Sequence, residues 1–203
     1  MNATIAADQA PAVAAFDPRP LFLLALEQWE QVVTGYAPAQ LDLPTPCDEF
    51  DLRALVGHTV GAVHRIAYIG EGGRGMDLPA AVGEIDDADW VGAVSRARAR
   101  ATSAWAAEEK LDRVVEVPWG TVPGRIALGG YLMELSTHTW DIAQVVDPAA
   151  ELDQELGAVA LGIAQQVLPA DGRGGDLPFG AVQPAPADAD TYTRLAAWLG
   201  RTV

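Results

Sequence analysis

The chain has 203 residues and a formal net charge of −15, because 28 acidic residues outnumber 13 basic ones. A surface with this charge repels phosphate backbones and anionic bilayers, so we expect neither nucleic acid nor a membrane as a partner. The single cysteine excludes an intrachain disulfide, and the N-terminus lacks the basic and apolar regions of a signal peptide. Both features favour a cytoplasmic protein.

The spacing of apolar residues predicts an all-α protein. Residues 1–16 are alanine-rich without a clear period, and we expect a flexible tail there. Further along, apolar residues recur every three to four positions, the period of an amphipathic helix. This pattern predicts helices over about residues 17–35, 51–70, 87–109, 127–146 and 153–168, with a short last helix over 191–199.

Two connecting segments have a different character. Residues 112–126 contain a run of valines followed by proline and glycine, which is typical of short extended structure with turns. Residues 169–190 are rich in proline, glycine and aspartate and are expected to be irregular. We therefore predict a four-helix bundle within residues 17–168, with a loop and short helix over 169–203 packing on it.

The expected fourth helix carries a candidate metal pair. Glu134 and His138 are four residues apart, so they lie about 40° apart on one face of a helix. Asp141 continues the same ridge and is a candidate for orienting His138 or for a simple salt bridge. A buried carboxylate without a partner is costly, and a divalent cation would offset that cost. His58, on the apolar stripe of the second helix, could supply a third ligand.

The ordinary alternatives stay open at this point. Glu134 and His138 could form only a hydrogen bond one turn apart, and spacing alone favours that interpretation because such pairs are common by chance. His58 could be a satisfied core histidine. His64 lies about 120° from His58 around the helix, so we expect it outside any shared site. Cys47 has an acidic neighbourhood that disfavours a thiolate, so a structural role is expected.

Arg65 is a further candidate on the second helix. It follows His58 by two turns on the same ridge. It could bind a substrate carboxylate, although a solvated arginine near a helix end is the simpler interpretation.

Several short segments over about residues 17–201 are informative when taken together. They are Thr45-Pro46-Cys47, Asp51 to Leu55, Gly57-His58, Pro118-Trp119-Gly120, Pro123-Gly124, Glu134 to Asp141, Asp176 to Gly180, Arg194-Leu195 and Leu199-Gly200-Arg201. Each segment is weak alone, but their order and spacing resemble those of a known family, the actinobacterial DinB-like proteins related to the N-terminal domain of mycothiol-dependent maleylpyruvate isomerase.

This resemblance implies a DinB-like bundle that binds a divalent metal, zinc by preference, through His58, Glu134 and His138. It also implies mycothiol as a cosubstrate, since members of the family use a low-molecular-weight thiol. A metal favours the thiolate over the thiol, which creates a nucleophile at neutral pH. The isomerase has a sizeable additional C-terminal domain, whereas this chain continues beyond residue 168 only as a loop and a short helix. Functions that residues of that domain have in the isomerase therefore cannot be assigned to residues of this chain.

The sequence thus favours a mycothiol-dependent S-transferase acting on a small electrophile, with isomerase activity less favoured. One alternative is a non-catalytic metal-binding or stress-response protein of the same fold. Another is a structural or interaction module without a metal. The sequence leaves open which electrophile, which thiol and which native ion the protein uses. It also leaves open whether the protein is catalytic and whether it forms a homodimer.

Overall fold

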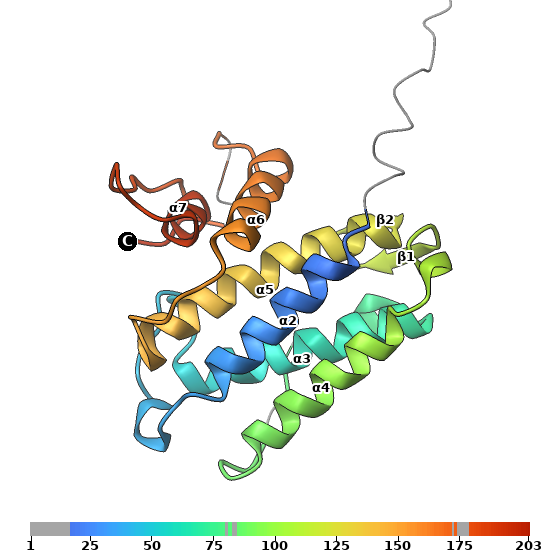
Figure 1. Ribbon diagram of the computed structural model, residues 1–203, viewed down its shortest axis with the longest axis horizontal. Coiled ribbons are helices and arrows are strands. Elements are labelled where there is room, and N and C mark those ends of the chain that lie inside the picture. Colours follow the sequence, from blue (N-terminus) through green and yellow to red (C-terminus); the bar gives the residue numbers. More distant parts are fainter. Residues whose placement is uncertain (1–16, 80, 83–84, 172, 174–178) are drawn as a thin grey trace, which may run out of the picture.

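The computed structural model describes residues 17–79, 81–82, 85–171, 173 and 179–203. The tail expected over residues 1–16 lies outside these. Four long helices form a bundle, confirming the expected all-α fold (Figure 1). The elements are α2 (Arg19–Val33), η1 (Pro38–Gln40), α3 (Leu52–Glu71), η2 (Gly75–Asp77), α4 (Trp90–Ala104), η3 (Glu108–Lys110), β1 (Val114–Val117), β2 (Gly120–Pro123), α5 (Gly124–Val146), α6 (Gln154–Val167) and α7 (Thr191–Trp198).

The bundle closes because each of its helices contributes an apolar face to one continuous core. Helix α2 packs on α4 and α5, and α3 packs on the same two helices from the other side. Helices α3 and α5 run in opposite directions (Figure 1). All four helices contribute core residues that are at most 3% exposed; examples are Phe22, Trp29, Leu55, Ile66, Trp90, Val94, Leu128 and Leu132.

Aspartate side chains cap the N-termini of α3, α6 and α7. The Asp51 carboxylate accepts a hydrogen bond from the backbone N–H of Ala54, 2.8 Å away, and begins α3 as expected for an N-cap. Helix α4 is shorter than predicted and ends at Ala104. The reason is tertiary: Trp105 turns into the core, where its indole donates a hydrogen bond to the Ile66 carbonyl at 2.9 Å.

The extended segment is a hairpin of two antiparallel strands, with Val115 opposite Val122 and Val117 opposite Gly120. Its turn carries Trp119, which is half-exposed and lies against α5. The ring centroids of Trp119 and Tyr131 are 4.8 Å apart in an edge-on arrangement.

The C-terminal residues return to the bundle. Helices α6 and α7 pack on each other and on α5 (Figure 1). Gly200 ends α7 in a left-handed conformation with φ of 95°, which glycine adopts without strain. A Cβ there would lie 2.9 Å from the Cα of Gly180. The Arg201 N–H then donates to the Ala196 carbonyl at 2.9 Å, a closing turn that brings Arg201 to α5.

Within the part of the chain that the structure describes, no helix is both long and apolar enough to span a bilayer.

Candidate metal centre

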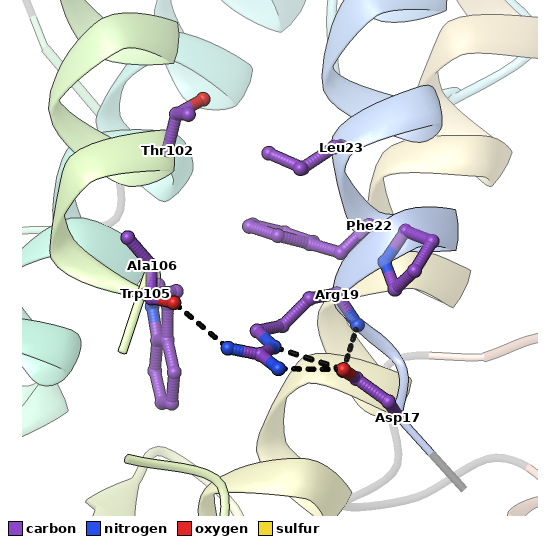
Figure 2. Close-up of a pocket in the computed structure, with 8 residues that line it drawn as sticks. Asp17, Arg19, Phe22, Leu23, Thr102, Trp105 and Ala106 are labelled. Carbon is purple, nitrogen blue, oxygen red and sulfur yellow. Dashed lines mark hydrogen bonds and ion pairs between the residues drawn. The ribbon is translucent and has the colours of Figure 1, made fainter. Parts of the chain in front are cut away.

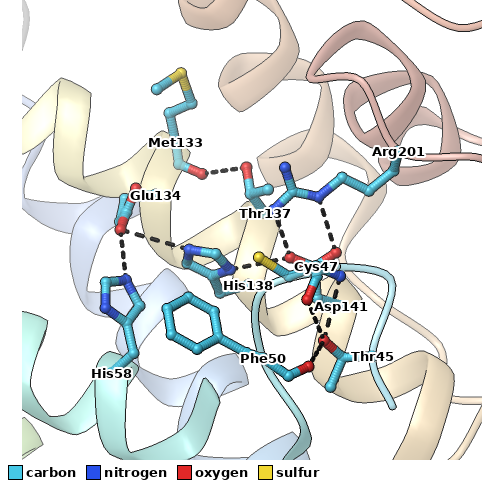
Figure 3. A network of polar contacts seen from close by, with 10 residues as sticks. All are labelled: Thr45, Cys47, Phe50, His58, Met133, Glu134, Thr137, His138, Asp141 and Arg201. Carbon is cyan, nitrogen blue, oxygen red and sulfur yellow. Dashed lines mark hydrogen bonds and ion pairs between the residues drawn. The ribbon is translucent and has the colours of Figure 1, made fainter. Parts of the chain in front are cut away.

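Helices α3 and α5 bring together the three side chains predicted to bind a metal. His58 Nε2 lies 3.2 Å from Glu134 Oε1, and His138 Nε2 lies 3.5 Å from the same oxygen (Figure 3). All three donor atoms fall within 4.8 Å of one another. The structure thus brings the predicted residues of two helices into one cluster.

The surroundings of the two histidines limit their freedom. The Phe50 ring stacks on His58 with centroids 5.3 Å apart and planes 18° apart. His58 in turn meets His138 edge-on at 5.1 Å. The His138 side chain is only 10% exposed and that of His58 17%, whereas Glu134 reaches 32%. One side of the cluster is therefore accessible while the imidazoles are held in place.

The cluster fits a divalent ion such as zinc. Imidazole nitrogen and carboxylate oxygen bind zinc at about 2.1 Å, and tetrahedral geometry then separates two ligand atoms by about 3.4 Å. The separations from Glu134 to His58 and to His138, 3.2 Å and 3.5 Å, bracket that value. Three protein ligands are also the set that leaves a fourth position for water or substrate.

The charges at the cluster are strongly coupled. Burial opposes ionisation of Glu134, but its hydrogen bonds to His138 and His58 outweigh burial and hold its pKa far below the usual range. Burial likewise opposes a charged His138, but hydrogen bonds to Asp141 and Glu134 prevail and raise its pKa to about 9. The metal-free cluster is therefore stabilised by a proton on His138, and a cation would take that proton's place.

A second layer of contacts orients His138. Its Nδ1 lies 2.9 Å from Asp141 Oδ2, and the Asp141 side chain is completely buried. Arg201 donates from Nε and from one terminal nitrogen to the two oxygens of Asp141, at 3.2 Å and 2.9 Å (Figure 3). A carboxylate behind a histidine fixes the ring and its tautomer, so Nε2 is directed toward Glu134.

Sequence reasoning missed two neighbours of this centre. Arg201 reaches it from the end of α7, and only its place in the Leu199-Gly200-Arg201 segment hinted at a role. The Cys47 sulfur lies within 4.8 Å of donor atoms of His138 and Asp141. Nothing in the acidic surroundings of Cys47 along the sequence indicated this proximity.

The loop that carries Cys47 is held by Thr45. The Thr45 hydroxyl accepts from the Cys47 N–H at 3.2 Å and donates to the Phe50 carbonyl at 2.8 Å. Burial raises the pKa of the Cys47 thiol; Arg201 lowers it, and Asp141 raises it further. The protonated thiol is a weak nucleophile and a poor metal ligand.

The other two candidates on α3 lie outside the cluster. His64 faces α4, where its Nδ1 is 3.5 Å from a guanidinium nitrogen of Arg100. Arg65 is half-buried and donates to the Leu78 carbonyl at 2.6 Å. Neither residue contacts His58, Glu134 or His138 among the described contacts.

Two cavities lie elsewhere on the described surface. One, of about 320 Å³, lies between α2 and α4, where Arg19 bridges Asp17 and the Ala106 carbonyl (Figure 2). The other, of about 470 Å³, lies beside α2 near Gln28 and Asp153. The residues that line these cavities include none of the three predicted ligands.

Comparison with known proteins decides the family. Residues 22–143, more than half of the chain, match the family described as the mycothiol maleylpyruvate isomerase N-terminal domain. The chain belongs to this family. Two uncharacterized proteins of Mycobacterium tuberculosis, from the CDC 1551 / Oshkosh and H37Rv strains, are each 30% identical over 187 residues. These alignments cover 92% of this chain and 99% of theirs.

Solved structures agree on the fold. Two crystal structures of the mycothiol-dependent maleylpyruvate isomerase, one of them a point mutant, match with TM-scores of 0.53 and 0.56 at 14% identity. Each match covers 75% of this chain and 69% of the isomerase chain. The family match over residues 22–143 confirms the family resemblance predicted from the sequence.

The raised pKa of His138 predicts a pH-dependent affinity for zinc. A metal needs the neutral imidazole, so binding below a pKa of about 9 must release the His138 proton. We expect the affinity to rise by up to about tenfold per pH unit from pH 7 and to level off near pH 9. Competition with a chelator at each pH measures this slope. His64→Ala should show the same slope, and a flat profile in both proteins would contradict the assignment.

Neither Cys47 nor His64 is expected to bind the metal. The Cys47 thiol is held protonated, and His64 faces α4. Cys47→Ala and His64→Ala should therefore each retain about one zinc ion per chain. Elemental analysis after adding zinc back measures the content, and circular dichroism verifies the fold. Loss of zinc from a folded Cys47→Ala protein would make Cys47 a ligand together with His138 and Asp141.

Proposed function

We propose that this protein is a mycothiol-dependent S-transferase in which His58, Glu134 and His138 hold one divalent ion, zinc by preference. The convergence of three suitable donor atoms within 4.8 Å supports this proposal most directly. Membership of the mycothiol maleylpyruvate isomerase N-terminal domain family supports the choice of thiol. The required partners are a low-molecular-weight thiol and a small electrophile. A reducing cytoplasm suits such a reaction.

When bound, the ion would supply the charge that keeps a thiol deprotonated at neutral pH. The chain's own residues prepare that position. Asp141 holds the His138 ring in one orientation, and Glu134 contributes a single negative charge between the His58 and His138 rings. One carboxylate leaves the site net positive when a dication is present, which favours an anionic thiolate over water.

We propose transfer rather than isomerisation for this chain. The likeness to the isomerase, at 14% identity over 69% of the isomerase chain, concerns the fold and not the reaction. Within this chain, Arg201 contacts Asp141 and through it supports His138, one of the three candidate ligands.

A conjugation assay tests the proposal against a non-catalytic metal-binding role. Zinc-loaded protein is mixed with mycothiol and a set of small electrophiles, and thiol consumption is compared with the uncatalysed rate. The S-transferase predicts an enhanced rate that His58→Ala abolishes and His64→Ala retains. Enhancement that persists in metal-free His58→Ala would overturn the metal-thiolate mechanism. Metal binding without enhancement for any pair would favour the non-catalytic role.

A further inference from the structure

A second group of potential metal ligands shares His138 with the metal centre. The Cys47 sulfur, a ring nitrogen of His138 and a carboxylate oxygen of Asp141 lie within 4.8 Å of one another. Figure 3 shows the sulfur beside the edge of the His138 ring that faces Asp141, away from Glu134. We refer to Cys47, His138 and Asp141 as the thiol cluster.

The two ring nitrogens of His138 face different groups. Nε2 lies 3.5 Å from Glu134 Oε1, whereas Nδ1 lies 2.9 Å from Asp141 Oδ2. An ion at the metal centre would bind Nε2, and an ion in the thiol cluster would bind Nδ1. A neutral imidazole has one lone pair and one N–H, so it binds only one of these ions at a time. An ion in the thiol cluster therefore removes His138 from the metal centre.

The surrounding chain holds the thiol cluster in place. The Asp141 side chain is completely buried, that of His138 is 10% exposed, and Cys47 is partly buried. The Cys47 N–H donates to the Thr45 hydroxyl at 3.2 Å, and the Cys47 carbonyl accepts from the Phe50 N–H at 2.8 Å. These bonds fix the loop that carries the thiol, so little conformational freedom is lost when an ion binds.

The donor atoms of the thiol cluster favour a soft cation. Thiolate is a soft ligand that selects ions such as Cu(I), and imidazole is also a good ligand for copper. Coordination deprotonates a thiol outright, so an ion that binds sulfur strongly displaces the thiol proton of Cys47. Such an ion is also stable at the low coordination number that one sulfur, one nitrogen and one oxygen provide.

Zinc gains less from the thiol cluster than from the metal centre. Two Arg201 nitrogens already donate to the two Asp141 oxygens, at 3.2 Å and 2.9 Å, which makes Asp141 a weaker ligand. Glu134, by contrast, contacts His58 and His138, which are candidate ligands of the same ion. A soft cation depends mainly on sulfur and nitrogen, so the commitment of Asp141 to Arg201 affects it less.

We propose that Cys47, His138 and Asp141 form a second metal site, for a soft cation such as Cu(I), which is occupied at the expense of zinc at the metal centre. Starting from the zinc-bound protein, the Cys47 thiol releases its proton to solvent, and the sulfur lone pair binds the ion. His138 loses the proton on Nδ1, whose lone pair binds the ion, and gains a proton on Nε2 in place of zinc. The ion keeps its oxidation state. This site goes beyond the proposed function, because it makes the metal centre respond to soft cations.

Silver tests the site directly, because Ag(I) is a soft cation that stays monovalent in air. Zinc-loaded protein is titrated with Ag(I), and the released zinc is measured with a colorimetric chelator. We expect the wild type to release about one zinc ion for each Ag(I) ion bound. Cys47→Ser replaces sulfur by hard oxygen with little change of shape. This variant should retain its zinc and bind Ag(I) at least about a hundredfold more weakly.

Nitrogen NMR of isotope-labelled histidine identifies the ligand atom. The chemical shifts of His138 distinguish a ring nitrogen that binds an ion from one that carries a proton. We expect the ion on Nε2 with zinc and on Nδ1 with Ag(I). The signals of His64, which faces α4, should stay unchanged. The same titration of metal-free protein tests the thiol cluster independently of zinc.

Met76→Leu controls for binding of silver to thioethers. Met76 is 65% exposed on η2, and its sulfur is another soft ligand. This variant should show the Ag(I) affinity and zinc release of the wild type. Cooperative unfolding is measured for every variant, and Cys47→Ser, which changes one atom in a partly buried loop, should remain folded.

Three results would overturn the soft-cation site. Ag(I) that binds Cys47 without moving the His138 signals would be bound by a reactive thiol alone. Ag(I) binding with zinc fully retained would show that the two ions do not compete for His138. Equal zinc release from wild type and Cys47→Ser would place the soft cation elsewhere. Absence of catalysed mycothiol transfer would overturn the S-transferase but not this site, since neither titration uses mycothiol or an electrophile.

Discussion

Replacing His138 with alanine is expected to abolish zinc binding and the stability that zinc confers. A ligand that binds only the folded state stabilises it by about 4 kcal/mol at a thousand times its dissociation constant. For a chain of this length, that corresponds to a shift of about 10 °C in Tm. Chelation should therefore lower the Tm of the wild type by about this amount and leave that of His138→Ala unchanged.

Glu134→Gln sharpens this prediction because it keeps the shape of the side chain and removes only its charge. Loss of the charge between His58 and His138 should weaken zinc binding by at least about a hundredfold. The apolar core is untouched, so both variants should unfold cooperatively. Equal zinc content in wild type and His138→Ala, measured after adding zinc back, would remove His138 from the site.

Replacing Asp141 with alanine is expected to cause the second large effect. It leaves Arg201, whose side chain is 12% exposed, without its carboxylate, and leaves His138 Nδ1 without a partner. Breaking a buried pair by removing one partner costs about 3–5 kcal/mol, or about 10 °C in Tm at this chain length. Loss of the group that orients a metal-binding histidine should weaken metal binding by about 10–100-fold.

A double-mutant cycle separates these two effects. Asp141→Ala/Arg201→Met removes both charges, so it should recover much of the lost stability but not the lost metal affinity. Asp190→Ala serves as the control, since Asp190 caps α7 through the Thr193 N–H at 2.7 Å and lies outside the centre. It should cost about 1 kcal/mol and leave zinc binding unchanged. Additive stability effects of Asp141→Ala and Arg201→Met would show that the two side chains do not interact.

The candidate ligands could be found from the sequence because their relation is mostly local. The period of one helix places Glu134, His138 and Asp141 along one ridge, and the apolar stripe of another places His58 on its inner face. The helical period does not determine whether the inner faces of two helices bring their polar residues to the same level along the bundle axis. The 3.2 Å contact between His58 and Glu134 depends on how α3 and α5 pack.

Contacts made by loops and chain ends could not be predicted from the sequence. Cys47 approaches His138 because the connector before α3 folds over α5, and Arg201 approaches Asp141 because the chain turns at Gly200. The early end of α4 has the same origin, since Trp105 leaves the helix to donate to the Ile66 carbonyl. Local propensity does not encode a contact between residues separated by 39 or more positions.

The sequence by itself determined the helices, the acidic surface and the faces on which the histidines and Glu134 lie, because short-range sterics and the helical period fix these features. Only the tertiary structure decided that the two faces converge within 4.8 Å and that Asp141 and Arg201 stand behind His138. The physical reason is that burial and hydrogen-bond partners belong to the packed assembly of helices and loops, where desolvation makes each unpaired group costly.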